Sequence, residues 1–175
     1  MFNQVLNDIP EIKYIGDPIL RRKTQLVEVS EDKEIGKNLG KILLRYREIA
    51  GNGRGLAAPQ IAISKAVFVT FIDNKLETFI NPIIIEKSSE NNFYKELCIS
   101  SGIMAADVER PEEITMEWTN FEGKRQSKKF DGFLARLYQH EEAHLRGKLN
   151  LDESTEDGIG FATFDPLKEQ LRKNR

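Results

Sequence analysis

Hydrophobic and polar positions along the chain change their period several times. The clearest helical pattern covers residues 31–50, where apolar side chains recur every three or four residues: Ile35, Leu39, Ile42, Leu43, Tyr46 and Ile49. Side chains with this spacing lie on one face of a helix. We expect Ser30 to cap the start of this helix and Gly51 to end it.

Beyond residue 65 the pattern becomes that of β-strands. Residues 66–72 are rich in β-branched and aromatic side chains, and a turn follows them. Segments 77–81 and 83–85 are predicted as separate strands, because Pro82 cannot donate a hydrogen bond to a sheet. Two further strands are predicted, over residues 114–119 and over the polar stretch that leads to Phe130.

A second helix is predicted over residues 131–145, with Asp131 as its cap and Gly147 at its end. A short C-terminal helix is predicted near 165–175, because Asp165-Pro166 is a favourable start. Helices and strands are thus separate along the chain and do not alternate regularly. This order favours an α+β fold.

Composition narrows the class of protein. The chain has 175 residues, so we expect one domain over 1–175. The 26 basic and 28 acidic residues give a net charge of 26 − 28 = −2, which argues against a dedicated DNA-binding protein. A single cysteine excludes an internal disulfide. We find no membrane-spanning run and no signal peptide, and therefore expect a cytoplasmic protein.

The strongest candidate for chemistry is the segment Gln139-His140-Glu141-Glu142-Ala143-His144 in the second predicted helix. Histidines four residues apart project from one face of a helix, so both can reach one metal ion. A glutamate directly after the first histidine can hold the attacking water. These are the only two histidines of the chain, which weakens the case for a chance match.

Catalytic zinc-type sites use three protein ligands, and the spacing alone leaves the third one open. A metzincin protease would need a histidine where Asn150 stands. A thermolysin-like protease would use a downstream acid as the third ligand. Only 175 − 144 = 31 residues follow His144, which is too few for the second lobe of such a protease. Cys98 is the remaining soft ligand, although a lone cysteine is more often a small buried apolar residue.

Three motifs together resemble the peptide deformylase family. They are Gly55-Leu56-Ala57-Ala58-Pro59-Gln60, Glu96-Leu97-Cys98-Ile99-Ser100 and Gln139-His140-Glu141-Glu142-Ala143-His144-Leu145. Similar segments stand in the family's order and spacing from about residue 10 to residue 152. The resemblance implies mostly antiparallel sheets packed around a central metal-binding helix that carries the second and third ligands.

The resemblance also implies roles for individual residues. The metal ligands would be Cys98, His140 and His144, with Glu141 as general base. The side-chain amide of Gln60 and the backbone N–H of Ile99 would stabilise the oxyanion. The resemblance implies one divalent metal ion per chain, with Fe²⁺ as the expected physiological ion and Zn²⁺ or Ni²⁺ as alternatives.

The chain departs from the family's motifs at several positions that bear on substrate binding. Leu97 stands where the family has a glycine, so we expect strain there if that position needs a positive φ. Arg54 stands beside Gly55, where the family has a small or aliphatic residue near its methionine pocket. Ala143 replaces an aspartate before the second metal histidine. Arg54, Gly55 and Leu97 are our candidate substrate contacts.

The resemblance predicts an enzyme that removes the N-formyl group from the initiator methionine of nascent polypeptides. Other possibilities are a related metallo-amidase with a different acyl or peptide substrate, an inactive deformylase-like binding protein and a zincin-type endoprotease. A basic C-terminal end suggests the ribosome as a partner through rRNA phosphates. Its basic residues are Lys168, Arg172, Lys173 and Arg175.

Overall fold

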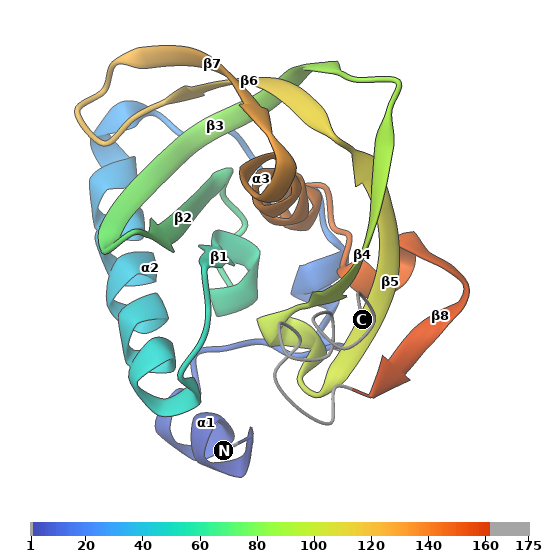
Figure 1. Cartoon of the computed structure of the whole chain (residues 1–175). Coiled ribbons are helices and arrows are strands. Elements are labelled where there is room, and N and C mark those ends of the chain that lie inside the picture. The colour runs from blue at the N-terminus through green and yellow to red at the C-terminus, as the bar shows by residue number, and fades with distance from the viewer. Residues whose placement is uncertain (1, 162–175) are drawn as a thin grey trace.

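The structure is a computed structural model that describes residues 2–161, in which two antiparallel sheets enclose a helix (Figure 1). The enclosed helix is α3 (Gly132–Leu145). The larger sheet has the order β1-β2-β3-β6-β7 and the smaller sheet has the order β4-β5-β8. This is the α+β class expected from the separate helices and strands. The predicted C-terminal helix near 165–175 lies outside the described residues.

The bounds of the strands follow the order of the two sheets. The larger sheet contains β1 (Gly55–Ala57), β2 (Val67–Ile72), β3 (Lys75–Lys87), β6 (Glu113–Thr119) and β7 (Arg125–Asp131). The smaller sheet contains β4 (Asn91–Leu97), β5 (Met104–Pro111) and β8 (Ser154–Phe161). The sequence patterns did not predict β1, β4, β5 and β8.

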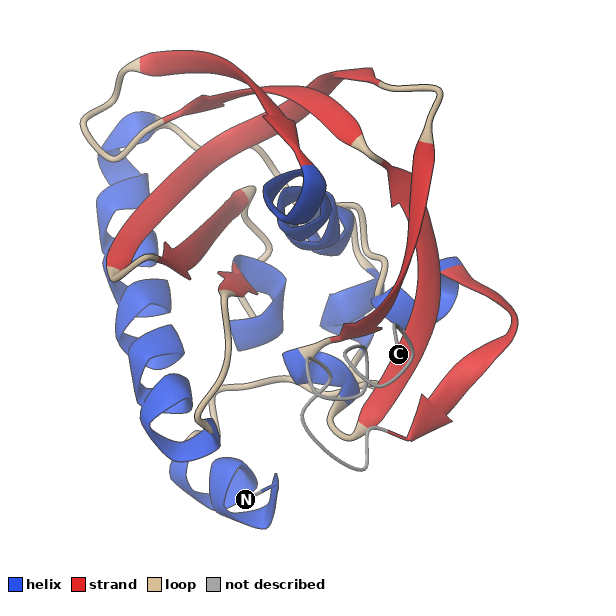
Figure 2. Ribbon diagram, in the orientation of Figure 1, coloured by secondary structure: helices blue, strands red, loops and turns tan. Residues whose placement is uncertain are grey.

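Two further helices, α1 (Phe2–Asp8) and α2 (Val29–Ala50), complete the part of the fold that bears on the site. Helix α2 packs on the face of the larger sheet opposite α3 (Figure 2). Along β2, Val67 and Val69 belong to the apolar cluster under α2, whereas Phe68 belongs to the cluster under α3. Because both faces of this strand are buried, its sequence is apolar without alternation.

Helix α2 begins at a different residue from the one predicted, but it ends where the sequence predicts. The helix begins at Val29, so the prediction that Ser30 caps it is wrong. Two residues before the helix, the side chain of Asn81 holds the backbone of Val27 through its N–H (3.0 Å) and its C=O (2.7 Å). This anchor fixes where the helix can start. Gly51 ends the helix with a φ of 71°, as predicted.

Strand β3 is one long strand, so the prediction of two strands separated by Pro82 is wrong. The register between β3 and β6 shifts between Ile80 and Ile83, and Asn81 has a φ of 49°. This irregularity is a bulge, where a proline does not interrupt a required hydrogen bond. The strand therefore continues past the proline with a bend.

Candidate metal centre

Helix α3 carries both histidines of the chain on one buried face. The helix spans Gly132–Leu145, close to the predicted 131–145, and Gly147 follows it with a φ of 78°. His140 and His144 lie on successive turns with ring centroids 4.9 Å apart and rings nearly perpendicular, at 87°. Both are buried, with exposed fractions of 8% and 1%. Their imidazoles therefore share one enclosed space.

Cys98 reaches this space from the smaller sheet. It follows β4 directly and precedes a short 3₁₀ turn over Ile99–Ser101. Its Sγ lies 3.3 Å from Nε2 of His144, and the candidate ligand atoms of Cys98, His140 and His144 all lie within 4.8 Å of one another. Within residues 2–161 this is the one such cluster of ligand-type residues. One sulfur and two imidazole nitrogens suit a divalent transition metal.

Each imidazole is oriented through its Nδ1 atom. Nδ1 of His140 lies 2.9 Å from Oε2 of Glu96, and Nδ1 of His144 lies 3.1 Å from the backbone oxygen of Lys148. If each Nδ1 donates to its partner, each Nε2 is left with a lone pair for a metal ion. The carbonyl of Ala143 accepts the N–H of Lys148 at 3.0 Å and so holds the group that orients His144. Backbone atoms orient this ring although Ala143 carries no carboxylate.

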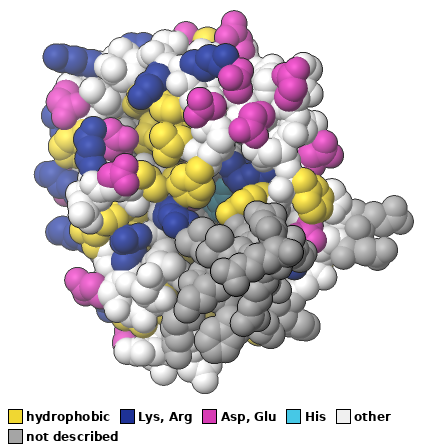
Figure 3. Space-filling view, in the orientation of Figure 1, with side chains coloured by type: hydrophobic (Ala, Val, Ile, Leu, Met, Phe, Trp, Pro, Cys, Tyr) yellow, Lys and Arg dark blue, Asp and Glu magenta, His cyan; other side chains and the backbone are white. Residues whose placement is uncertain are grey.

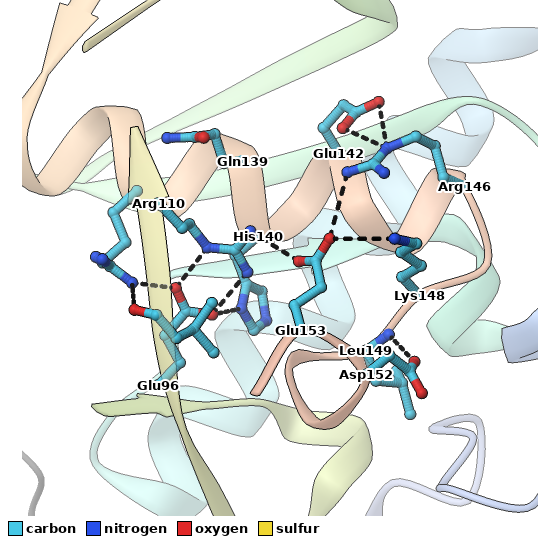
Figure 4. A network of polar contacts seen from close by, with 12 residues as sticks. Glu96, Arg110, Gln139, His140, Glu142, Arg146, Lys148, Leu149, Asp152 and Glu153 are labelled. Atoms are coloured by element: carbon cyan, nitrogen blue, oxygen red, sulfur yellow. Dashed lines mark hydrogen bonds and ion pairs between the residues drawn. The ribbon is translucent and has the colours of Figure 1, made fainter. Parts of the chain in front are cut away.

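Glu96 is the centre of a buried cluster of charges behind His140 (Figure 4). Arg110 donates to both of its oxygens, at 2.6 and 2.8 Å, and Arg136 donates to one at 2.6 Å. Glu153 accepts a further bond from Arg110 at 2.8 Å, so the two acids balance the two guanidinium groups. Burial opposes the ionisation of Glu96, but bonds from Arg110 and His140 hold its pKa well below the usual range.

Sequence reasoning gave this cluster no role. Its members were visible only as charged residues inside buried elements, such as Arg136 within the apolar first turns of α3. Asn150 is a similar case, because the sequence shows only that it stands where a metzincin protease would have a histidine. In the structure it is buried, accepts a bond from the Ser101 hydroxyl at 2.7 Å and donates to the Glu96 carbonyl at 3.0 Å. It therefore ties together the two sides of the Cys98 segment.

The electrostatic surroundings of Cys98 favour the thiolate form, which binds metals. Full burial would raise the pKa of the thiol. When protonated, the neighbouring imidazoles of His144 and His140 outweigh burial through their charge and hydrogen bonds and bring the pKa of the thiol well below its ordinary value. The three candidate ligands are thus assembled in one place.

Glu141 lies beside the cluster, fully buried. Burial raises the pKa of this carboxyl to about 7. Its Oε2 atom has no hydrogen-bond partner among the described residues. Gly55 of β1 packs so closely that a Cβ atom there would lie 2.1 Å from Oε1 of Glu141. A side chain at position 55 would therefore displace the glutamate.

Gln60 and Ile99 flank the same space. Gln60 is buried in the short helix after β1, and its Oε1 accepts the N–H of Ala57 at 2.8 Å. This bond turns Nε2 toward the hydroxyl of Ser100, at 3.1 Å, and toward Sγ of Cys98, at 3.7 Å. Ile99 opens its 3₁₀ turn, where the first N–H groups have no partner within the turn. Both candidate donors thus lie next to Cys98.

The three candidate substrate contacts take different positions around the cluster. Gly55 packs on Glu141, as described above. Leu97 is the last residue of β4, pairs with Ala105 and does not have a positive φ, so the strain considered for this position is absent. The guanidinium of Arg54 lies 4.9 Å from the ring centroid of Phe133. Figure 3 shows histidine atoms at the bottom of a hollow with hydrophobic and basic side chains around it.

Comparison with known proteins agrees with this architecture. Residues 9–158 match the family model described as "Polypeptide deformylase". The peptide deformylase of Pseudothermotoga lettingae is 39% identical over 144 residues, which is 82% of this chain and 82% of that protein. That of Dictyoglomus thermophilum is 37% identical over 151 residues, which is 86% of this chain and 96% of that protein.

Solved structures give the same result. A probable peptide deformylase from Synechococcus phage S-SSM7 has a TM-score of 0.74 and 36% identity, covering 81% of this chain and 97% of that one. The peptide deformylase of Thermotoga maritima has a TM-score of 0.71 and 33% identity, covering 83% and 97%. The matches in sequence and in structure both extend over most of the chain, which therefore belongs to the peptide deformylase family.

Proposed function

We propose that this chain is a metal-dependent hydrolase that removes the N-formyl group from the N-terminal methionine of nascent polypeptides. Membership of the peptide deformylase family supports this activity over the other candidates. The observation that carries it is the cluster of Cys98, His140 and His144 with the unpartnered carboxylate oxygen of Glu141 beside it. We also propose that residues 1–175 act as one catalytic domain and work in the cytoplasm. Among the described residues, no helix is long and apolar enough to cross a membrane.

One divalent metal ion per chain would be held by Cys98, His140 and His144. The two Nε2 atoms and the thiolate fit such an ion, because the opposite nitrogen of each imidazole already has a partner. We propose Fe²⁺ as the physiological ion, with Zn²⁺ or Ni²⁺ able to replace it. When bound, the ion would lower the pKa of water and polarise the formyl oxygen. Helix α3, which carries two of these ligands, would then be the central metal-binding helix of the fold.

Glu141 would act as the general base and then as the general acid. Its carboxylate would accept a proton from the attacking water through Oε2 and would pass it to the amine that leaves. A pKa of about 7 suits both directions of this transfer near neutral pH. The amide of Gln60 and the N–H of Ile99 would donate to the oxygen on which negative charge develops. The hydrogen bond from the Ala57 N–H to Gln60 Oε1, which leaves Nε2 on the side of Cys98, supports this role.

The substrate would be the N-formylmethionyl end of a nascent peptide. Strand β1 is at the edge of the larger sheet and leads to Gln60, and β4 is at the edge of the smaller sheet and leads directly to Cys98. A peptide in an extended conformation can pair with such an edge. Gly55 and Leu97 lie on these two edges and would contact the peptide backbone, and Arg54 would lie near its first side chains.

Hydrolysis of formyl-Met-Ala by the iron-loaded protein, with acetyl-Met-Ala as the competing substrate, tests the function. We expect formyl-Met-Ala to be cleaved far faster. Glu141→Ala should retain one metal ion per chain and lose at least about 10²-fold in turnover, the usual contribution of a general base. Preference for the acetyl peptide would instead support the related metallo-amidase, and near wild-type turnover of Glu141→Ala would remove its assigned role.

The metal ligands can be tested without activity. Cys98→Ala should lose the ion or most of its affinity, because two protein ligands rarely hold a catalytic divalent ion. Metal content after anaerobic loading and desalting measures this, with the outward-facing Ile103→Ala as a matched control near the same loop. Stoichiometric metal in Cys98→Ala would contradict the assigned ligand set.

We also propose contact with the ribosome through the basic C-terminal residues. These residues lie outside the described part of the chain, so the proposal depends on charge alone. Deletion of residues 166–175 should weaken co-sedimentation with ribosomes while peptide hydrolysis is retained. Equal co-sedimentation of the intact and shortened chains would end this proposal.

A further inference from the structure

Arg54 is an exposed residue whose guanidinium lies over the ring of Phe133, at the start of the helix that carries both histidines. It directly precedes Gly55, the residue that packs against Glu141. Its guanidinium carbon lies 4.9 Å from the centroid of the Phe133 ring, and Phe133 is 45% exposed. A guanidinium over a ring is held by a cation–π interaction while its N–H groups remain free to bind. The side chain thus has a defined position and unused donors.

The position of this pair can be deduced from helix geometry. Phe133 lies 140 − 133 = 7 residues before His140 on α3, which places both side chains on the same face two turns apart. At 1.5 Å per residue this separation is about 10 Å along the helix. A peptide in an extended conformation advances about 3.3 Å per residue. A chain that starts at the metal centre and runs toward Phe133 would therefore reach Arg54 within its first three residues.

The charge of Arg54 is not balanced by an acid in the described part of the chain. None of the ion pairs among the described side chains includes Arg54, whereas Arg45 pairs with Glu11. The backbone oxygen of Arg54 accepts the N–H of Phe71 at 2.8 Å, which fixes the main chain and leaves the guanidinium for other partners. An unpaired cation on a rim that the substrate passes attracts an acidic group on that substrate.

We infer that Arg54 selects among formylated chains and favours those with an Asp or Glu side chain in their first three residues. Phe133 holds the guanidinium toward the substrate and is therefore a positioning residue. The inference rests on the proposed deformylase function and adds a substrate class to it. A carboxylate at the right distance would bind the fork of the guanidinium through two parallel hydrogen bonds.

The test is a set of formyl-Met tripeptides in which one of the two following residues is Ala, Glu or Lys. At one of the two positions, the iron-loaded wild-type protein at low salt should prefer Glu to Lys. We expect kcat/KM for the Glu peptide to exceed that for the peptide with Lys at the same position by about five- to tenfold, mainly through KM. The ratio should fall toward 1 at about 0.5 M salt, where exposed charges are screened. Arg54→Met should abolish the ratio, and Arg54→Lys should retain part of it.

Lys41→Met is the matched control, because Lys41 is an exposed basic residue of α2 outside the site. It should keep both the Glu-to-Lys ratio and the rate on formyl-Met-Ala. Phe133→Leu should reduce the ratio by releasing the guanidinium. Equal rates on Glu and Lys peptides, or a ratio that survives Arg54→Met, would overturn the inference and leave the proposed function standing. Failure to cleave any formyl peptide would overturn both.

Discussion

The two faces of α3 are held by opposite kinds of interaction. Toward the larger sheet, Tyr138 packs among aromatic rings, with centroids 4.8 Å from Phe79 and 4.6 Å from Phe130. Toward the smaller sheet, Arg136 and His140 bind the buried carboxylate of Glu96. The aromatic face is apolar and has little directional preference, whereas the charged face fixes angles as well as distances.

This difference indicates a division of labour along one helix. Apolar packing supplies stabilisation that depends mainly on buried area, so it keeps α3 against the sheet. A buried ion pair contributes little net stability but constrains geometry, because an unmatched buried charge is costly. We therefore expect changes on the aromatic face to alter stability alone and changes on the charged face to alter stability and metal binding together.

The largest effect is expected for Glu96→Gln. The neutral amide would leave Arg110 and Arg136 buried without their counter-charge, which typically costs about 3–5 kcal/mol of unfolding free energy. The amide would also leave one acceptor oxygen where Arg110, Arg136 and His140 now share two, which weakens the orientation of His140; such losses reduce metal affinity by about 10- to 100-fold. Urea unfolding and competitive metal titration measure the two effects. Glu77→Gln, at an exposed pair with Lys75, is the control and should change neither.

The second largest effect is expected for Tyr138→Leu, on the aromatic face of the helix. Removing this ring should lower the unfolding free energy by about 1–3 kcal/mol, because it leaves space and loses aromatic contacts. Metal affinity should stay at the wild-type value, since no ligand or orienting group is touched. A fall in metal affinity that matches the one in Glu96→Gln would show that the two faces do not act separately.

The smallest effect is expected from mild acid, because the contribution of Glu96 is lost at no more than about 1.4 kcal/mol per pH unit below 4.5. The pKa of Glu96 is lowered in the folded protein, so its contribution to stability is complete above the ordinary value of 4.5 and is lost as the pH falls below it. Wild-type unfolding free energy should therefore decrease between about pH 4.5 and lower values more steeply than that of Glu96→Gln. Parallel curves for the two proteins, measured by urea unfolding at each pH, would contradict this assignment.

Local patterns in the sequence were enough for α3, β2, β6 and the end of α2, because each depends on its own side chains. They were not enough for β4, β5 and β8, whose strands read as mixed polar segments and are stabilised by pairing with one another. The bulge that accommodates Pro82 depends on Asn81 binding Val27, 54 residues away in sequence. Such a contact has no local signature.

The residues of the candidate metal site were predictable, but the residues that support them were not. His140 and His144 follow from helical spacing, and Cys98 followed only from the family resemblance. The roles of Glu96, Arg110 and Asn150 depend on which elements meet in space, and nothing in their immediate sequence indicates a partner. Ala143 is the opposite case. The sequence lacks a carboxylate at this position, but in the structure the backbone carbonyl of Lys148 orients the His144 ring.

The order of the candidate metal ligands along the chain has a consequence during synthesis. Cys98 emerges 140 − 98 = 42 residues before His140. At about 5–20 residues per second, its thiol waits roughly 2 to 8 seconds before the first imidazole emerges. During that interval the sulfur lacks the neighbours that bury it and the ion that would occupy it. The Cys98 thiol is therefore more accessible to oxidants and competing metal ions in the growing chain than in the folded protein.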